Sequence, residues 1–413
     1  MHNSVVVIST PTTGVPITIE APAAARDRFA HDQIAQLIAL RRELHRHPEL
    51  SWKEYATSDR LAEVTASLGG EVSRVANTGV VARFRGRDPS APAVAIRGDI
   101  DALPIQEETG LDYASVVPGV MHACGHDVHT TWAIGAAMDL VREPARGDVL
   151  VVLQPAEEVG AGAPAVLASG ALDGVAAIFG GHVDRRFAVG EVIAQAGPLA
   201  ASADTFSITL IGQGAHGARP HESADPIVAA AAVITALQTI VARRIDPAAP
   251  AVCTVGSVHA GIASNVIPGT ATLTGTLRAM DPHTRRRLGD EVRRIVIAVA
   301  ESYGVRADVA VELGTPPIVN SEREAEWAAT AATAVLGDAA VVPFGITNMG
   351  GEDFAFYLER IPGCFLRFGA CEAGGSAVAA HSSRFYAADG AIFVGAAVLA
   401  QCARVASEAL AQR

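Results

Sequence analysis

Cysteine is scarce in this sequence. Only five of its 413 residues are cysteines, and they are odd in number and widely scattered: Cys124, Cys253, Cys364, Cys371 and Cys402. A disulfide framework is therefore not expected. This cysteine usage favours a reducing, cytoplasmic location.

Basic charge is also in short supply. Thirty-two Lys and Arg residues face 44 Asp and Glu residues, which gives a formal net charge of −12. A large basic field for nucleic acid or an anionic membrane is therefore not expected. Short basic runs such as Arg285–Arg287 are interpreted as solvated helix faces. We expect a small-molecule substrate, with no nucleic-acid or membrane partner.

Long uninterrupted apolar runs are missing too. Charges and glycines break the Ala-rich blocks, so no membrane-spanning segment is predicted. Residues 1–25 mix Ser, Thr, Pro and Ala around the short run Val5–Ile8. That run lacks a basic lead and is too short for the core of a signal peptide. We expect a loose N-terminal extension there, or at most a minor edge strand.

The chain is long enough for two domains with full cores. From residue 32 to 197, amphipathic helices alternate with strands that end in polar residues, which is typical of a mixed α/β sheet. The pattern of predicted elements changes near residue 198. After it we expect strands at 205–211, 252–258 and 271–277 and helices at 226–241 and 282–300. The sequence therefore predicts a small α+β domain over 198–310. It is inserted into a discontinuous domain made of 1–197 and 311–413.

The most informative segment runs from His122 to Asp127. Cys124 and His126 flank Gly125, and this spacing lets an irregular turn direct both side chains to one point. Thiolate and imidazole are ligands that a borderline divalent metal prefers. A lone Cys or His is most often a buried or surface side chain. The density of such residues here, with His129 following, favours a metal site.

Two adjacent carboxylates, Glu157 and Glu158, follow an expected strand at 148–153. One is suited to bind metal and the other to accept a proton from activated water. The alternative is a solvated helix start, where acids are favoured by the helix dipole. His182 and His381 read alone as surface histidines, and they become candidate ligands because the site needs more nitrogen donors. One Cys, three His and one Glu suit two metals with a shared ligand, so we expect a metal-dependent hydrolase.

Together these residues resemble the M20 metallopeptidase family. The resemblance is to its amidohydrolase branch, which includes hippurate hydrolases, bacterial N-acyl-amino-acid amidohydrolases and plant auxin-conjugate hydrolases. It runs from about Ile34 to Ala400. The blocks that carry it are Arg42–Glu49, Arg97–Pro104, Met121–Asp127, Gln154–Glu158, Gly214–His216, Arg219–His221, Asn265–Pro268 and Gly351–Phe354.

The resemblance implies a mixed-sheet, zinc-peptidase-like catalytic domain with an inserted ferredoxin-like lid that also forms a homodimer. It implies two divalent metal ions per subunit, of zinc, manganese, cobalt or nickel. Cys124 would bridge these ions, and the other ligands would be His126, Glu158, His182 and His381.

The same resemblance implies roles for four further residues. Glu157 would be the general base and later the acid. His216 would reach a neighbouring subunit's site and polarise the scissile carbonyl. Asn265 and Arg278 would hold the substrate's carboxylate, since a guanidinium grips a carboxylate with two hydrogen bonds.

The implied reaction is hydrolysis of an N-acyl or N-aroyl amino acid to a carboxylic acid and an amino acid. A dipeptidase of the M20 type and a hydrolytic deaminase of an aromatic amine stay open, because sequence does not place the side chains of the pocket. A non-catalytic metal-binding homologue is a third alternative. The intact Glu157 and His216 argue against it.

Several positions depart from the family pattern, among them the residues before Asn265 and after His381. Arg97 stands where other branches place a metal-binding His, so we interpret Asp99 as an orienting residue and not as a ligand. After His182 the chain has Arg185 and Arg186 where relatives often have Pro or an aromatic residue. We hypothesise that Arg185 or Arg186 widens recognition of acidic substrates.

Overall fold

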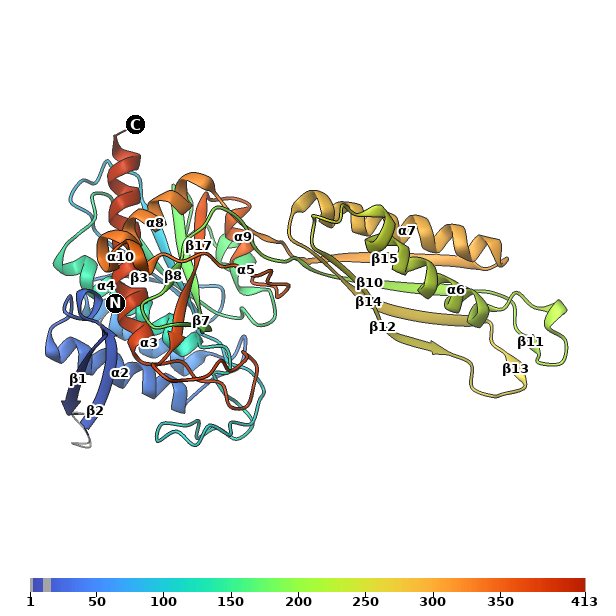
Figure 1. Ribbon diagram of the computed structural model, residues 1–413, viewed down its shortest axis with the longest axis horizontal. Helices are drawn as coiled ribbons and strands as arrows, with labels where there is room; N and C mark the ends of the chain where they lie inside the picture. The colour runs from blue at the N-terminus through green and yellow to red at the C-terminus, as the bar shows by residue number, and fades with distance from the viewer. Residues whose placement is uncertain (1–2, 10–15, 413) are drawn as a thin grey trace. The chain divides into compact units, whose positions relative to one another are not determined.

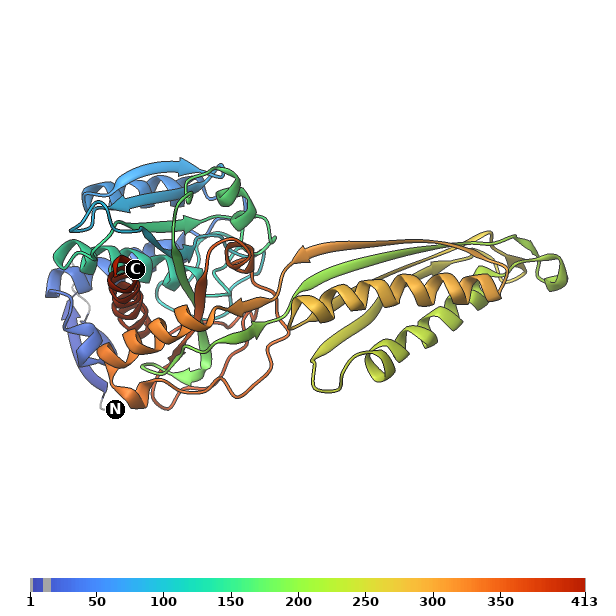
Figure 2. The same cartoon turned by 90° about the horizontal axis from the view of Figure 1, so that it is seen from above.

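The structure, a computed structural model, describes residues 3–9 and 16–412. The chain forms two compact units, which Figures 1 and 2 show in two views. Unit 1 comprises Met1–Gly197, Asn320–Gly345 and Phe356–Arg413, and unit 2 comprises Pro198–Val319 and Ile346–Ala355. The chain first enters unit 2 at the short strand β9 (Gly197–Ala200) and first leaves it at β16 (Ile318–Asn320), and it returns to unit 2 for residues 346–355.

Unit 1 is built on a seven-stranded sheet of order β3-β4-β6-β5-β7-β17-β8. Its strands are β3 (Glu71–Val75), β4 (Gly79–Phe84), β5 (Val94–Asp99), β6 (Val149–Gln154), β7 (Ala177–Ala188), β8 (Val192–Ile193) and β17 (Gly363–Cys371). Strands β6, β5, β7 and β17 run parallel. Because parallel strands end at a common edge, residues that follow β5 and β6 are brought together there.

Unit 1 also contains helices, several of which pack against its sheet. They are α1 (Ala23–Arg26), α2 (His31–Arg46), α3 (Tyr55–Ser67), α4 (His126–Arg142), α5 (Gly162–Ala168), α8 (Glu322–Leu336), the 3-10 turn η3 (Asp338–Ala340), α9 (Ala355–Leu358) and α10 (Gly390–Ala411). Helix α10 packs against α4 and α8. The close approach of α10 to α4 depends on Gly395 of α10, because a Cβ atom there would lie 2.4 Å from Cε3 of Trp132 in α4. Helix α4, which begins at His126, is thus held firmly.

The N-terminal segment is more ordered than the sequence predicts. Strands β1 (Asn3–Ser9) and β2 (Pro16–Pro22) pair antiparallel, and β2 packs against α10. Of the two alternatives expected for residues 1–25, the loose extension is wrong for the described residues, whereas a strand is present at Val5–Ile8 within β1, in a two-stranded sheet of its own. The Val- and Ile-rich composition favours extended backbone. Residues 1–2 and 10–15 of that expectation lie outside the described part of the chain.

Unit 2 is a four-stranded antiparallel sheet of order β12-β14-β10-β15 with two helices on one face (Figure 2). Its elements are β10 (Ala203–Ile211), β11 (Ala215–His216), the 3-10 turn η1 (Pro220–Glu222), α6 (Pro226–Thr239), the π-helical turn η2 (Ile240–Arg244), β12 (Ala251–Ala260), β13 (Val266–Ile267), β14 (Thr270–Ala279), α7 (Pro282–Ser302) and β15 (Arg306–Thr315). Alternate residues of β10, which are Phe206, Ile208 and Leu210, are buried in the core. This is the pattern of a sheet with one covered face.

The boundary of the inserted domain differs from the predicted one. We expected the domain to end at residue 310, but β15 runs to Thr315 and pairs with β10 along its length. Unit 2 therefore continues to Val319, and it also includes Ile346–Ala355. The prediction failed because it counted three strands in this domain and left out β15.

Among the described residues, two helices are long and apolar enough to cross a membrane by length and composition, Pro226–Arg244 and Gly390–Ala411. The sequence analysis predicted no such segment because it looked for uninterrupted apolar runs. The mean hydropathy of a helix can be high even where a few charges or glycines interrupt the run. The apolar window of Gly390–Ala411 is 89% buried inside the protein, as expected of a core helix. The window in Pro226–Arg244 is 33% buried, and α6 packs there against the sheet of unit 2 and against α7.

Candidate metal centre

A left-handed turn before α4 places Cys124 and His126. Gly125 adopts φ 88°, which favours glycine. A Cβ atom on Gly125 would also lie 2.5 Å from Cγ2 of Val183. Cys124 is a free thiol, as are the other four cysteines. The predicted turn between the two ligands is thus present, and it requires glycine for two reasons.

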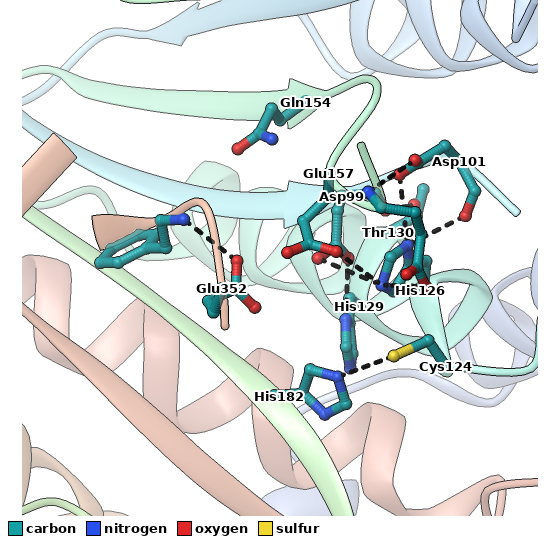
Figure 3. A network of polar contacts seen from close by, with 12 residues as sticks. Asp99, Asp101, Cys124, His126, His129, Thr130, Gln154, Glu157, His182 and Glu352 are labelled. Carbon is teal, nitrogen blue, oxygen red and sulfur yellow. Dashed lines mark hydrogen bonds and ion pairs between the residues drawn. The ribbon is translucent and has the colours of Figure 1, made fainter. Parts of the chain in front are cut away.

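The candidate ligands of unit 1 form overlapping groups around Cys124. The ligand atoms of Cys124, His126 and His182 lie within 4.8 Å of one another, and so do those of Cys124, Glu158 and His381. The sulfur of Cys124 lies 3.1 Å from Nε2 of His182. Figure 3 shows the sulfur of Cys124 directed toward His182, with His126 beside Cys124. All five residues predicted as ligands therefore meet in unit 1.

Two of these imidazoles are oriented by backbone carbonyls. Nδ1 of His126 lies 2.9 Å from the carbonyl oxygen of Asp101, and Nδ1 of His182 lies 2.6 Å from that of Val183. Each Nδ1 carries the proton that it donates, so in the neutral ring Nε2 keeps its lone pair. A carbonyl partner of this kind is typical of a metal-binding histidine.

Two buried polar atoms in the cluster have no hydrogen-bond partner among the described residues. They are Nε2 of His126 and Oε1 of Glu158, which lie 3.8 Å apart. Leaving such atoms unpaired in a protein interior costs free energy. A cation between them would satisfy both, and the thiolate, imidazole and carboxylate donors suit a divalent metal. The residues present therefore fit a metal site.

The electrostatics of the cluster agree with this fit. Burial raises the pKa of Glu158 to about 7, and the carboxylates of Asp101 and Asp99 add to the rise while His126 opposes it. Burial, together with the charge of Glu158, also raises the pKa of the Cys124 thiol. Both acids therefore resist ionisation without a nearby cation. A divalent ion would reverse this effect, since it favours thiolate and carboxylate.

Glu157 lies beside the cluster on a strained turn. Ala156 before it has φ 53°, a value that is uncommon outside glycine, and its backbone N–H donates to Glu54 over 2.9 Å. Oε2 of Glu157 lies 3.8 Å from Nε2 of His126. The Glu157 side chain is only 11% exposed, and α5 does not begin until Gly162. The alternative of a solvated helix start is therefore wrong for this pair.

Asp101 is a supporting residue that sequence reasoning missed. Its Oδ2 accepts hydrogen bonds from the backbone N–H of Glu158, over 3.0 Å, and from the hydroxyl of Ser51, over 2.7 Å. Its backbone carbonyl orients His126, as described above. Asp101 thus connects two candidate ligands. The only available signal was its place in the block Arg97–Pro104.

Asp99 and His129 form a second buried pair next to the candidate ligands. Asp99 bonds Nη1 of Arg97 at 2.5 Å and Nδ1 of His129 at 2.7 Å. Burial opposes ionisation of Asp99, but Arg97 and the two nearby histidines lower its pKa well below the usual value. Nε2 of His129 accepts the backbone N–H of Val183 over 3.0 Å. Both ring nitrogens of His129 are therefore in use, and Asp99 orients it.

Asp127 and His122 have surroundings of their own. Asp127 forms an ion pair with Arg41, with Nε 2.9 Å from its Oδ2, and the same oxygen lies 2.8 Å from Nδ1 of His45. His122 is buried near His45, and burial lowers its pKa to about 4. Neither residue belongs to a group with the geometry to hold a metal among the described residues. The sequence segment thus supplies two candidate ligands and two structural residues.

The hypothesis about Arg185 and Arg186 loses its basis in the structure. Arg185 has a wholly buried side chain that bonds Glu372, and Arg186 bonds Asp184 through two nitrogens. Each guanidinium already has a carboxylate partner within unit 1. Recognition of acidic substrates would require these pairs to break.

The candidate residues of unit 2 are placed differently. Strand β11 pairs with β13, which sets His216 opposite Val266 and beside Asn265. Both His216 and Asn265 are exposed, and Nδ1 of His216 accepts the backbone N–H of Ala218 over 3.0 Å. In the neutral ring the proton is therefore on Nε2, ready to be donated.

Arg278 does not meet Asn265 within one chain. It lies at the end of β14 and donates to the carbonyl of Ser202 over 3.5 Å. Asn265 lies before the other end of β14, and the strand between spans roughly 26 Å at the usual rise per residue. The sequence prediction that both residues hold one carboxylate is therefore not met by a single copy of unit 2.

Comparisons with known proteins agree with the fold and the cluster. The chain is 42% identical over 342 residues to the N-acetyl-L-cysteine deacetylase of Bacillus subtilis, with 81% of this chain and 80% of the relative covered. It is 41% identical over 297 residues to the N-acyl-L-amino acid amidohydrolase of Geobacillus stearothermophilus, covering 71% and 80%.

A crystal structure from Bacillus subtilis, described as a dinuclear metal binding peptidase from the M20 family, matches with a TM-score of 0.82 and 36% identity. The match covers 92% of this chain and 99% of that one. The sequence pattern of peptidase family M20/M25/M40 matches residues 95–405. That range includes all nine predicted site residues. The chain therefore belongs to peptidase family M20/M25/M40.

Proposed function

We propose that this protein hydrolyses the amide bond of N-acyl or N-aroyl amino acids to give a carboxylic acid and a free amino acid. Two relatives above 40% identity carry names for activity on such amides. The observation that carries the proposal is the pair of donor groups that share Cys124, with Glu157 beside them. The substrate is a small molecule with a carboxylate.

Two divalent ions per subunit fit these groups. Cys124 would be shared, with His126 and His182 in one group and Glu158 and His381 in the other. Such ions supply polarisation of a carbonyl and a lowered pKa for water. Thiolate and imidazole favour zinc, and manganese, cobalt and nickel are the competing metals. Metal content of the purified protein decides among them.

Glu157 moves the proton in this proposal. Its carboxylate takes a proton from water as the water oxygen bonds to the amide carbon. The same carboxyl then gives that proton to the nitrogen as the C–N bond breaks. The nitrogen leaves as the amine of the amino acid, and the oxygen stays with the acid. Restricted exposure of Glu157 keeps other water away from this transfer.

The residues of unit 2 complete the site between two copies. His216 and Asn265 lie at the far end of β14 from Arg278, so one copy cannot present all three to one small substrate. We propose a homodimer in which His216 and Asn265 serve the neighbouring subunit. Nε2–H of His216 would donate to the developing oxyanion. Arg278, which contacts Ser202 near the start of unit 2, would bind the substrate's carboxylate in its own subunit.

The test is a product assay with defined substrates. N-acetyl, N-benzoyl and indole-acyl amino acids, dipeptides and aminobenzoates are each incubated with the protein, with and without chelator. We expect a free amino acid and a carboxylic acid from at least one acyl class, and loss of that activity with chelator. Cleavage of dipeptides alone, or release of ammonia from the aromatic amine, would replace the proposal with one of the two alternatives.

A further inference from the structure

Arg185 lies in β7, three residues after His182, and its side chain is wholly buried although it is charged. Its guanidinium bonds Glu372 through two nitrogens, with Nη1–Oε2 at 2.8 Å and Nη2–Oε1 at 3.1 Å. Burying such a charge is costly unless every donor has a partner. The partners of Arg185 therefore indicate what the residue holds together.

These partners lie in one loop or just before it. The loop runs from Glu372 to Tyr386 and contains no helix or strand. Besides Glu372, Arg185 donates to the carbonyl of Ala370 over 3.2 Å and to that of Ser376 over 2.9 Å. Its Cζ also lies 3.9 Å from the centre of the Tyr386 ring. One side chain thus joins both ends of the 372–386 loop.

Glu372 completes the connection. The hydroxyl of Tyr386 donates a short hydrogen bond to Oε1 of Glu372. Burial opposes ionisation, but the hydrogen bonds from Arg185 and Tyr386 lower the pKa of Glu372 to about 2. The carboxylate is therefore charged at neutral pH and matches the guanidinium. We refer to Arg185, Glu372 and Tyr386 as the loop clasp.

The loop carries His381, which is the least buried candidate ligand, with 54% of its side chain exposed. His381 has φ 65°, an uncommon value for a residue with a side chain. Its backbone N–H donates to the carbonyl of Ala123 over 2.8 Å, and its Nε2 lies 3.4 Å from Oε2 of Glu158. Few contacts therefore hold this ligand in place, and the shape of its loop matters.

We propose that Arg185 is a positioning residue for His381: by closing the base of the 372–386 loop, it presents that histidine to the metal centre. This inference rests on the proposed function, because it assumes that His381 binds metal. Arg185 itself contacts neither the metal nor the substrate. Its effect acts through His381, as do partners of ligands in other metal sites.

Arg186 provides a matched control in the same strand. It bonds Asp184, two residues away, at 2.8 Å and 2.5 Å, and its Cζ lies 5.4 Å from the centre of the Phe344 ring. None of these partners belongs to the 372–386 loop. Substituting Arg186 therefore removes an arginine and an ion pair from β7 and leaves the clasp intact.

The experiment measures metal binding first and turnover second. Wild type, Arg185→Met, Arg185→Lys, Tyr386→Phe and Arg186→Met are stripped of metal and titrated with zinc by calorimetry. We expect Arg185→Met to weaken the affinity for one of two zinc ions by about 10- to 100-fold, and Tyr386→Phe to weaken it less. Arg185→Lys should restore part of the loss, since it keeps the charge but not the two-pronged contact. Arg186→Met should match wild type.

A double-mutant cycle separates positioning from general stability. In the His381→Ala background, the Arg185→Met change should have little further effect on zinc affinity, because the ligand that it positions is gone. Equal additional losses in both backgrounds would overturn the proposal, as would equal affinities for Arg185→Met and Arg186→Met. If Arg185→Met does not fold, Tyr386→Phe in the same cycle gives the decision.

Failure of the proposed function would look different. If the wild-type protein binds no metal or cleaves no acyl amino acid, the proposed function as a metal-dependent hydrolase is refuted. If the wild type binds two ions and is active, and the clasp variants behave in the same way, only the positioning role of Arg185 is refuted. The two outcomes are read from different proteins in one experiment.

Discussion

The metal centre of unit 1 and the candidate substrate residues of unit 2 are built in opposite ways. In unit 1, buried residues such as Asp101 orient the ligands through hydrogen bonds before any metal is bound. In unit 2, His216 and Asn265 are exposed and short of partners. The contrast teaches that one chain fixes the candidate ligands through its own buried contacts, whereas it leaves the candidate substrate residues of unit 2 exposed. Each prediction below tests one side of this comparison.

The largest effect is expected at Glu157. The Glu157→Gln change keeps the size of the side chain and removes its ability to accept a proton. Turnover should fall by about 100- to 10,000-fold, the usual contribution of a general base. Metal content, measured by mass spectrometry of the metals in the protein, should stay near that of wild type.

Glu158→Gln is the matched control for that change. It alters the neighbouring carboxylate, which lies in the group with Cys124 and His381. We expect it to lose metal as well as activity. A Glu157→Gln protein that keeps its turnover, or that loses metal as Glu158→Gln does, would contradict the separation of base from ligand.

The next effect is expected at His216. His216→Ala should lower kcat by about 100- to 1,000-fold, as does removal of an oxyanion donor elsewhere. Metal content should not change, because His216 belongs to unit 2. Steady-state kinetics and metal analysis measure both quantities.

Mixing two inactive variants tests whether His216 serves the neighbouring subunit. In a mixed dimer of His216→Ala with Glu157→Gln, one site has both mutations and the other has neither. Random exchange of subunits should restore about a quarter of the wild-type activity. No recovery after confirmed exchange would place His216 in its own subunit's site.

Packing is also expected to differ between the units. Gly395→Ala in unit 1 would push a methyl group to 2.4 Å from the Trp132 ring and should destabilise the protein by about 1–3 kcal/mol. Gly256→Ala in unit 2 is the control, because its nearest contact would be 3.9 Å. Denaturant unfolding gives both values. Equal stabilities for the two variants would show that α4 and α10 can move apart.

Part of the donor cluster could be predicted from short segments of the sequence. Cys124 and His126 flank one glycine, and Glu157 and Glu158 are adjacent. The helix predicted at 282–300 lies within α7. These features are local, and residue type and spacing encode them directly.

The rest depends on contacts between distant parts of the chain. Arg185 bonds Glu372 across 187 residues, and this pairing exists because β7 and β17 are neighbours in the sheet. Strand β17 was not predicted, so the partner of Arg185 was not available. The same holds for β15, whose pairing with β10 moved the boundary of unit 2. A charge in a sequence does not reveal whether it faces solvent or a buried partner.

The smallest effect is expected at Arg278, which tests whether unit 2 contributes a contact to the substrate's carboxylate. Arg278→Lys keeps the positive charge and loses the planar fork that binds a carboxylate through two hydrogen bonds. We expect KM for an acyl amino acid to rise about tenfold, or about 1.4 kcal/mol, with kcat nearly unchanged. The corresponding amino-acid amide, which has no carboxylate, should show no such rise. An equal rise for both substrates would mean that Arg278 acts on the shape of β14, and that unit 2 contributes its carboxylate contact elsewhere.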